Sequence, residues 1–171
     1  IKVSYEEVLL PLLNRVGMFW STNSMNPAQE HFITNLVIQK LQAAIDSLPA
    51  APETSKSVLL FVPQNESHEI GLLMAKYILK NAGKRVIYLG ARVPFGNLKE
   101  TVQQCNPDSL LFFLIQVHPF EEIQDYLDKV SEEFNDKFIF VSGFPYILNN
   151  LNIPDNITWI SKPAEFEKML E

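Results

Sequence analysis

The sequence has few of the residues that build disulfide scaffolds, metal clusters or membrane spans. Its 171 residues include one cysteine and three histidines. The lone Cys105 cannot form an internal disulfide, and no Cys/His cluster has the spacing of a zinc site. The longest fully apolar run, residues 110–115, is far shorter than the roughly 20 residues that a membrane-spanning helix needs. The sequence therefore predicts neither a secreted disulfide scaffold nor a membrane protein.

Positive charge is also scarce. Fourteen Lys and Arg residues stand against twenty Asp and Glu residues, so the formal net charge is −6. A domain that binds the phosphates of nucleic acid is normally basic. We therefore expect that these residues do not bind DNA by themselves. Because the first residue is Ile1 rather than Met, we expect the chain to be part of a longer cytoplasmic protein.

Residues 1–50 have the apolar periodicity of helices. Apolar positions between Val3 and Trp20 recur at helical spacing, with Pro11 interrupting them, so two short segments are expected. The sequence Asn26-Pro27-Ala28-Gln29 predicts the start of a further helix, with Asn26 as the N-cap and Gln29 completing a capping box. This helix should run to about residue 48. We assign residues 1–50 to a helical cap, a partial helical bundle.

From residue 51 onward, short apolar runs alternate with amphipathic stretches. The expected strands are residues 58–63, 85–90, 109–117, 137–142 and 157–161. The expected helices are residues 68–81, 96–105, 120–134 and 163–171. Continuous apolar strands separated by helices predict a parallel sheet that is covered on both faces. We therefore assign residues 51–171 to an α/β domain with a doubly wound, Rossmann/flavodoxin-like sheet of five parallel strands, ordered 2-1-3-4-5.

The loop after the first expected strand carries the strongest candidate site. It reads Glu66-Ser67-His68-Glu69-Ile70-Gly71. A carboxylate two residues before a histidine can hold one ring N–H while the other ring nitrogen binds a metal. Gly71 would let a bulky group approach the backbone at the helix start. The alternative is a solvated loop in which these charged residues are merely hydrophilic, and the six residues alone leave both interpretations open.

The motif Glu66-x-His68-x-x-Gly71 resembles the Asp-x-His-x-x-Gly signature of cobalamin-binding domains, with Glu in place of Asp. The residues that follow are similar to the same family, because this sequence has the glycine, Leu-Gly, proline and Pro-Asp elements of the family in the same order, as Gly83, Leu89-Gly90, Pro94 and Pro107-Asp108. In that family the histidine replaces dimethylbenzimidazole beneath the cobalt, so the resemblance implies His68 as the metal ligand. It also implies that the cofactor contacts Glu66, Ser67, Gly71, Ser142 and Gly143.

A second resemblance lies upstream. Trp20 is followed after nine residues by Glu30-His31, a spacing similar to that in light-responsive, cobalamin-dependent repressors of the MerR type. In that family the tryptophan covers the upper face of the corrin, and the Glu-His pair lies near the upper ligand. The resemblance therefore implies Trp20, Glu30 and His31 as cofactor-binding residues. Without it, Trp20 would be interpreted as a core residue and Glu30-His31 as a surface pair.

Three positions differ from the family pattern. Phe113 stands where the family has a serine that hydrogen-bonds the displaced nucleotide tail. Ser142-Gly143 replaces a Gly-Gly pair, and Ser21 replaces a second histidine that is the upper cobalt ligand after illumination. These differences would narrow the channel for the tail and remove the upper histidine.

The resemblance implies the effector-sensing C-terminal module of a MerR-type transcription regulator, which is not an enzyme. Its cofactor would be cobalamin, as adenosylcobalamin or methylcobalamin, and DNA would be bound only through a winged-helix domain ahead of Ile1. An apolar helical stripe that needs a partner predicts a homo-oligomer; it consists of Leu12, Val16, Phe32 and Leu36. Two alternatives stay open: a corrinoid-carrying subunit of a methyltransferase, and a cofactor-free protein-interaction module of the same fold.

Overall fold

The computed structural model describes residues 26–116, 118–161 and 165. The helical segments predicted between Val3 and Trp20 lie outside these residues, as does the closing helix predicted at 163–171 apart from residue 165. The chain divides into two compact units between Ala44 and Ile45. Each unit is described by itself.

Helix α3, Pro27–Asp46, begins as the sequence predicts. The Asn26 side chain accepts a hydrogen bond from the backbone N–H of Gln29 at 2.9 Å. The Gln29 side chain accepts one in return from the backbone N–H of Asn26 at 3.1 Å. This reciprocal capping box satisfies two backbone donors at the helix start. The helix ends at Asp46, close to the predicted end at residue 48.

Part of the apolar face of α3 is bare. Phe32 is 72% exposed and Leu36 is 45% exposed. Val37 and Leu41, apolar residues of the same helix, are buried. Large exposed apolar side chains on one helix face are typical of an interaction surface. Leu12 and Val16, the other members of the predicted surface, lie outside the described residues.

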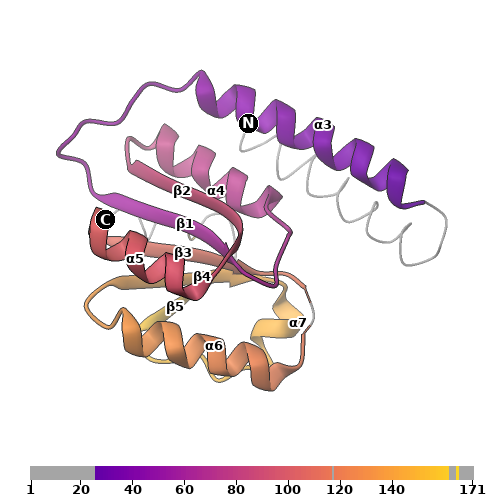
Figure 1. Cartoon of the computed structure of the whole chain (residues 1–171). Helices are drawn as coiled ribbons and strands as arrows, with labels where there is room; N and C mark the ends of the chain where they lie inside the picture. The colour runs from indigo at the N-terminus through magenta and orange to yellow at the C-terminus, as the bar shows by residue number, and fades with distance from the viewer. Residues whose placement is uncertain (1–25, 117, 162–164, 166–171) are drawn as a thin grey trace. The chain divides into compact units, whose positions relative to one another are not determined.

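The second unit is built on a parallel sheet with the strand order β2-β1-β3-β4-β5, which confirms the predicted doubly wound fold (Figure 1). The strands are β1 (Ser57–Pro63), β2 (Arg85–Val93), β3 (Ser109–Leu114), β4 (Phe138–Gly143) and β5 (Ile157–Ile160). The helices that follow them are α4 (Ile70–Asn81), α5 (Phe95–Cys105), α6 (Phe120–Glu133) and α7 (Pro145–Leu148).

The sheet separates two apolar cores. Every residue of β1 and β3 is buried, as expected for parallel strands covered on both faces. Helices α5, α6 and α7 pack on one face, and α4 packs on the other (Figure 1). Because successive strand side chains point to opposite faces, Phe112 belongs to the α5–α6 core and Phe113 to the α4 core.

The starts of β1 and β3 are tied together by one carboxylate. Asp108 accepts hydrogen bonds from the Ser57 backbone N–H at 2.7 Å and from the Ser57 hydroxyl at 2.8 Å. These bonds lower the pKa of Asp108, so it stays ionised. They set the register in which Val58 pairs with Ser109. The Pro-Asp element of the family resemblance therefore has a structural role here.

The structure corrects two predicted strand ends near the carboxyl edge of the sheet and adds one helix. Strand β2 continues past Gly90 to Val93, through a register irregularity. Strand β3 ends at Leu114, before residue 117, because the next two backbone N–H groups turn to a side chain of the β1–α4 loop. The short helix α7 was not predicted, although Pro145 in its first turn is a recognised start signal.

Candidate cofactor site at the carboxyl edge of the sheet

The histidine loop lies where the winding of the sheet reverses. Strands β1 and β3 are neighbours, and the chain leaves them toward opposite faces. Ligands of doubly wound sheets bind beyond the carboxyl ends of such strands. Residues 64–69 connect β1 to α4 at this edge, and Gly71 lies in the first turn of α4. The structure therefore places the predicted motif at the expected ligand edge.

Glu66 is the centre of this loop. It is only 3% exposed. Its Oε1 atom accepts hydrogen bonds from the backbone N–H groups of Ser67 and His68 at 2.8 and 2.9 Å, and contacts Nδ1 of His68 at 2.6 Å. Its Oε2 atom accepts from the N–H groups of Ile115 and Gln116 at 2.9 and 2.5 Å. One buried carboxylate thus binds the loop to the end of β3.

Electrostatics keeps Glu66 ionised. Burial raises its pKa, but the hydrogen bonds from the His68 side chain and from three backbone N–H groups outweigh burial and lower the pKa to about 2. An ionised carboxylate can only accept hydrogen bonds, so Nδ1 of His68 is the donor in this pair. Nε2 is then the ring nitrogen that a metal would use, and the partner raises its basicity.

The donor set suits a metal that brings most of its ligands with it. The His68 side chain is 58% exposed at the sheet edge. Among the described residues, no group of three or more His, Cys, Asp or Glu side chains could hold an ion. A single exposed imidazole cannot form a protein metal site, whereas it suits a cobalt ion that a corrin already surrounds. The residues present therefore fit a corrinoid, to which the protein would supply one cobalt ligand, the imidazole of His68.

The space above Gly71 is filled by the protein itself. A Cβ atom built on Gly71 would lie 2.7 Å from Cε1 of Phe113, closer than real Cβ contacts. Phe113 is 6% exposed and is part of the α4 core. The sequence predicts that Gly71 lets a bulky group approach the backbone. In the structure that group is the phenyl ring of Phe113.

Ser142 and Gly143 end β4 at the same edge. The Ser142 hydroxyl donates to the carbonyl oxygen of Ile160 at 2.9 Å, so it links β4 to β5. A Cβ atom on Gly143 would lie 2.0 Å from the carbonyl oxygen of Leu114. Glycine is required there for the close approach of β4 to β3. Both residues thus have a structural use at the positions predicted to contact cofactor.

The upstream candidates belong to the first unit. Oε1 of Glu30 accepts a hydrogen bond from the Thr34 hydroxyl at 2.7 Å, and Oε2 lies 3.5 Å from Nε2 of His31. The His31 side chain is 73% exposed. Trp20 lies outside the described residues. The Glu-His pair therefore exists as a local pair on α3, and its relation to His68 stays a prediction.

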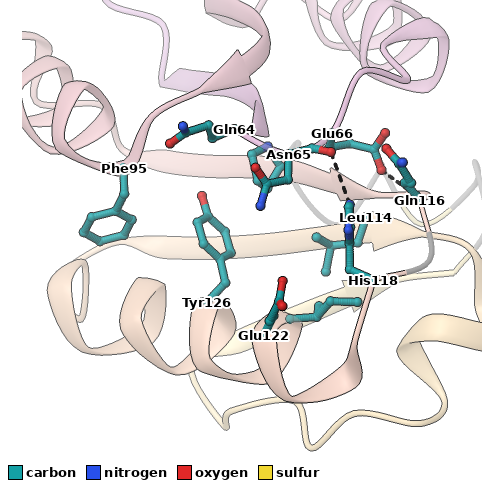
Figure 2. Close-up of a pocket in the computed structure, with 11 residues that line it drawn as sticks. Gln64, Asn65, Glu66, Phe95, Leu114, Gln116, His118, Glu122 and Tyr126 are labelled. Carbon is teal, nitrogen blue, oxygen red and sulfur yellow. Dashed lines mark hydrogen bonds between the residues drawn. The ribbon is translucent and has the colours of Figure 1, made fainter.

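A cavity of about 190 Å³, which the sequence does not predict, lies beside Glu66 (Figure 2). It lies on the face of the sheet that α5 and α6 cover, and its lining includes Gln64, Asn65, Phe95, Leu114, Ile123 and Tyr126. The lining residues that follow β1 and β3 could be predicted, because they lie at the carboxyl ends of the two strands between which the winding of the sheet reverses. Tyr126 was not, because its helical position gives no sign that it faces the sheet edge.

The second unit is a Rossmann-like α/β domain, with the histidine loop at the sheet edge where ligands of such folds bind. Residues 3–45 match the family model described as B12 binding domain. The chain is 33% identical over 129 residues to the HTH-type transcriptional repressor CarH of Myxococcus xanthus, and 30% identical over 149 residues to the HTH-type transcriptional repressor CarA of the same organism. The predicted resemblance to cobalamin-binding repressors is confirmed at this level, and cobalamin is the cofactor class that these comparisons support.

These alignments cover 75% and 87% of this chain but 42% and 47% of the two repressors. The chain therefore spans less than half the length of these relatives. Both are named as repressors, which agrees with the prediction of a module that is not an enzyme. In the described part of the chain, every helix is too short or too polar to cross a membrane.

Solved structures share the fold. A novel cobalamin-binding protein from Desulfitobacterium hafniense DCB-2 has a TM-score of 0.52 at 18% identity, covering 90% of this chain and 74% of its own. The monomethylamine corrinoid protein of Methanosarcina barkeri has a TM-score of 0.64 at 15% identity, covering 91% and 76%. The methanol:cobalamin methyltransferase complex MtaBC of M. barkeri has a TM-score of 0.56 at 15% identity, covering 98% and 65%. At these identities the likeness shows the fold alone.

Proposed function

We propose that this chain is the cobalamin-sensing module of a MerR-type transcriptional regulator in the cytoplasm. The kinship with two HTH-type repressors supports the regulatory role, and the match to the B12 binding domain supports the cofactor. DNA would be bound through a winged-helix domain elsewhere in the protein, because the net charge of these residues is −6. Residues 1–50 would act as the cap and residues 51–171 as the cofactor-binding domain.

The observation that carries this proposal is the Glu66–His68 pair. Nε2 of His68 would be the lower axial ligand of the cobalt, with Nδ1 held by the ionised Glu66 carboxylate. Such a second partner fixes the ring orientation and raises the basicity of a metal-binding histidine. Cobalamin, as adenosylcobalamin or methylcobalamin, would supply a cobalt centre whose upper ligand can change. Ser67, Gly71, Ser142 and Gly143 would shape the edge beneath the corrin.

The upper face of the site is proposed from the family resemblance alone. Trp20 would cover the corrin, with Glu30 and His31 close to the upper ligand. Ser21 is a weaker cobalt ligand than the imidazole that the family has there. We therefore propose that occupancy of the site, or contact with another copy of the chain, carries the signal.

A second candidate function is a cofactor-free module that acts through protein contacts. The packing of Phe113 against Gly71 favours it, because that packing closes the space next to the motif. The hydrogen bond of the Ser142 hydroxyl within the sheet also favours this function. The third possibility, a corrinoid-carrying methyltransferase subunit, has only the shared fold of the M. barkeri proteins in its favour.

Loading experiments separate these functions. The protein is mixed with adenosylcobalamin in the dark, passed through gel filtration, and its visible spectrum is recorded. We expect the cofactor to co-elute with a base-off/His-on spectrum that His68→Ala loses and that His118→Ala, a histidine change at the same edge, keeps. An unchanged spectrum in His68→Ala would refute the lower-ligand assignment. Elution of the protein without any corrinoid would favour the cofactor-free module.

A further inference from the structure

The last residue of the histidine loop, Glu69, is anchored to strand β2. The Tyr88 hydroxyl donates a hydrogen bond to Oε2 of Glu69 at 3.1 Å. Glu69 holds the N-cap position of α4, where a polar side chain commonly accepts a hydrogen bond from the first turn of the helix. Within the described residues its side chain makes no such capping bond. The carboxylate of Glu69 is therefore used by the strand rather than by the helix that it precedes.

The surroundings of Tyr88 make it a fixed donor. Its ring packs against the α4 core, and the ammonium group of Lys76 lies over the ring at 4.6 Å from the centroid. A cation in this position is attracted by the face of the ring. Burial, and then the carboxylate of Glu69, raise the pKa of Tyr88, so the hydroxyl keeps its proton. Tyr88 can therefore donate to Glu69 throughout the physiological pH range.

Strand β2 reaches the histidine loop at a second point. The backbone N–H of Arg92 donates to the carbonyl oxygen of Glu66 at 3.2 Å. Arg92 has a φ of 58°, in the left-handed region that residues with a side chain rarely adopt. Such a conformation costs free energy and persists only where the surrounding structure holds it. The strand thus binds the loop on both sides of His68, at Glu66 and at Glu69.

This double attachment bears on the exposed position of His68. The His68 side chain is 58% exposed and lies in a loop between β1 and α4. Glu66 holds Nδ1 of the ring, but the position of the ring also depends on the backbone that carries it. A loop that has to be ordered when it binds a metal loses conformational entropy at that moment. A loop that is already held in place avoids this cost.

We propose that Tyr88 is a positioning residue for His68, acting through Glu69. The inference rests on the proposed function, in which His68 is the lower cobalt ligand. Glu66 would orient the imidazole, and the Tyr88–Glu69 hydrogen bond would fix the backbone on the other side of it. Without that bond, residues 67–69 would sample more conformations, and Nε2 of His68 would be in place for ligation less of the time.

The first measurement uses cobinamide, a corrinoid that lacks the nucleotide base, so that an imidazole-bound spectrum comes from the protein. Its affinity is measured by absorbance titration for the wild type, Tyr88→Phe, His68→Ala and the control Tyr77→Phe, which removes a tyrosine hydroxyl from α4. The imidazole-bound spectrum should be present in the wild type and lost in His68→Ala. Tyr88→Phe should lose about fivefold in affinity, as for one hydrogen bond. Tyr77→Phe should behave as the wild type.

A mutant cycle tests whether Tyr88 acts through Glu69. Glu69→Gln keeps an acceptor for the Tyr88 hydroxyl and should retain most of the affinity, whereas Glu69→Ala should lose as much as Tyr88→Phe. In the Glu69→Ala background, Tyr88→Phe should cause no further loss, because the bond is already absent. An equal loss from Tyr88→Phe in both backgrounds would overturn the inference, since Tyr88 would then act by another route.

A second measurement needs no cofactor. The backbone N–H groups of Ser67 and His68 bond to Glu66, so their hydrogen exchange reports the order of the loop in the unloaded protein. Exchange should be faster in Tyr88→Phe and unchanged in Tyr77→Phe. Unchanged exchange and unchanged cobinamide affinity in Tyr88→Phe would overturn the inference and leave the proposed function intact. Faster exchange in a protein that binds no corrinoid would refute the proposed function, and with it the role of Tyr88 toward cobalt.

Discussion

Oε1 of Glu66 lies 2.6 Å from Nδ1 of His68, while Oε2 of the same carboxylate binds the N–H groups that follow β3. A single buried charge thus orients the loop histidine and fixes the end of the neighbouring strand. The proposed metal ligand and the stability of the sheet edge depend on the same side chain. Changes at Glu66 should therefore affect both properties together.

Glu66→Gln should destabilise the fold in a pH-dependent way. The pKa of Glu66 falls from 4.5 to about 2 on folding, so its stabilisation is complete above pH 4.5 and is lost as the pH falls toward 2. The shift corresponds to about 3 kcal/mol. Urea denaturation should show a wide gap between wild type and variant at neutral pH and a narrower gap near about pH 3.

The exposed Glu132 provides the control for this measurement. Glu132→Gln makes the same chemical change on the solvent side of α6 and should leave stability unchanged at both pH values. If the gap for Glu66→Gln were the same at neutral and acidic pH, its stabilisation would not come from the ionised form. The account of the tautomer of His68 would then fail as well.

Gly143→Ala should destabilise the sheet edge strongly. The added Cβ atom would meet the Leu114 carbonyl oxygen at 2.0 Å, and that oxygen is held in place by a hydrogen bond from the backbone N–H of Phe144. We expect a loss of about 2 kcal/mol or more in the free energy of unfolding. Gly96→Ala is the matched control, because a Cβ atom there meets nothing within 4 Å. It should be neutral or stabilising, by about 0.4–1 kcal/mol.

The contact between Gly71 and Phe113 should appear as a coupling in a double-mutant cycle. Gly71→Ala alone drives its new methyl group into a buried ring and should cost about 1–3 kcal/mol. Phe113→Leu alone leaves a small void. The double variant should be more stable than the sum of the single changes predicts, by about 0.5–3 kcal/mol. If chemical denaturation showed that the two losses in free energy of unfolding simply add, the Phe113 ring would move aside without cost and the prediction would be wrong.

The bare face of α3 should mediate self-association. Replacing Phe32 and Leu36 by Ser removes the two large exposed apolar side chains of the helix. Sedimentation velocity should then show a shift from oligomer to monomer. Replacing the exposed polar residues Gln39 and Gln42 by Ser is the control and should leave the oligomer intact. A wild type that sediments as a monomer at all concentrations would show that this prediction is wrong.

Local patterns in the sequence were sufficient to predict the strands and the longer helices of the described residues, but not the short helix α7. The capping box at Asn26 and Gln29 needs only three residues of separation, and α3 begins where it predicts. The fully buried strands β1 and β3 follow from continuous apolar runs. The end of β3 could not be foreseen, because its next N–H groups bond to Glu66, a residue distant in the sequence.

The sequence by itself determined the strand order and the pairing of Glu66 with His68, because right-handed crossovers constrain the topology and a spacing of two residues keeps both side chains in one loop. Only the tertiary structure decided that Phe113 closes the space over Gly71 and that the Tyr126 hydroxyl, beside a cavity, has no hydrogen-bond partner in the part of the chain that the structure describes. The register of the sheet and the packing of α4 and α6 set these contacts. They depend on which face each side chain meets across elements far apart in the chain, and no local spacing encodes that.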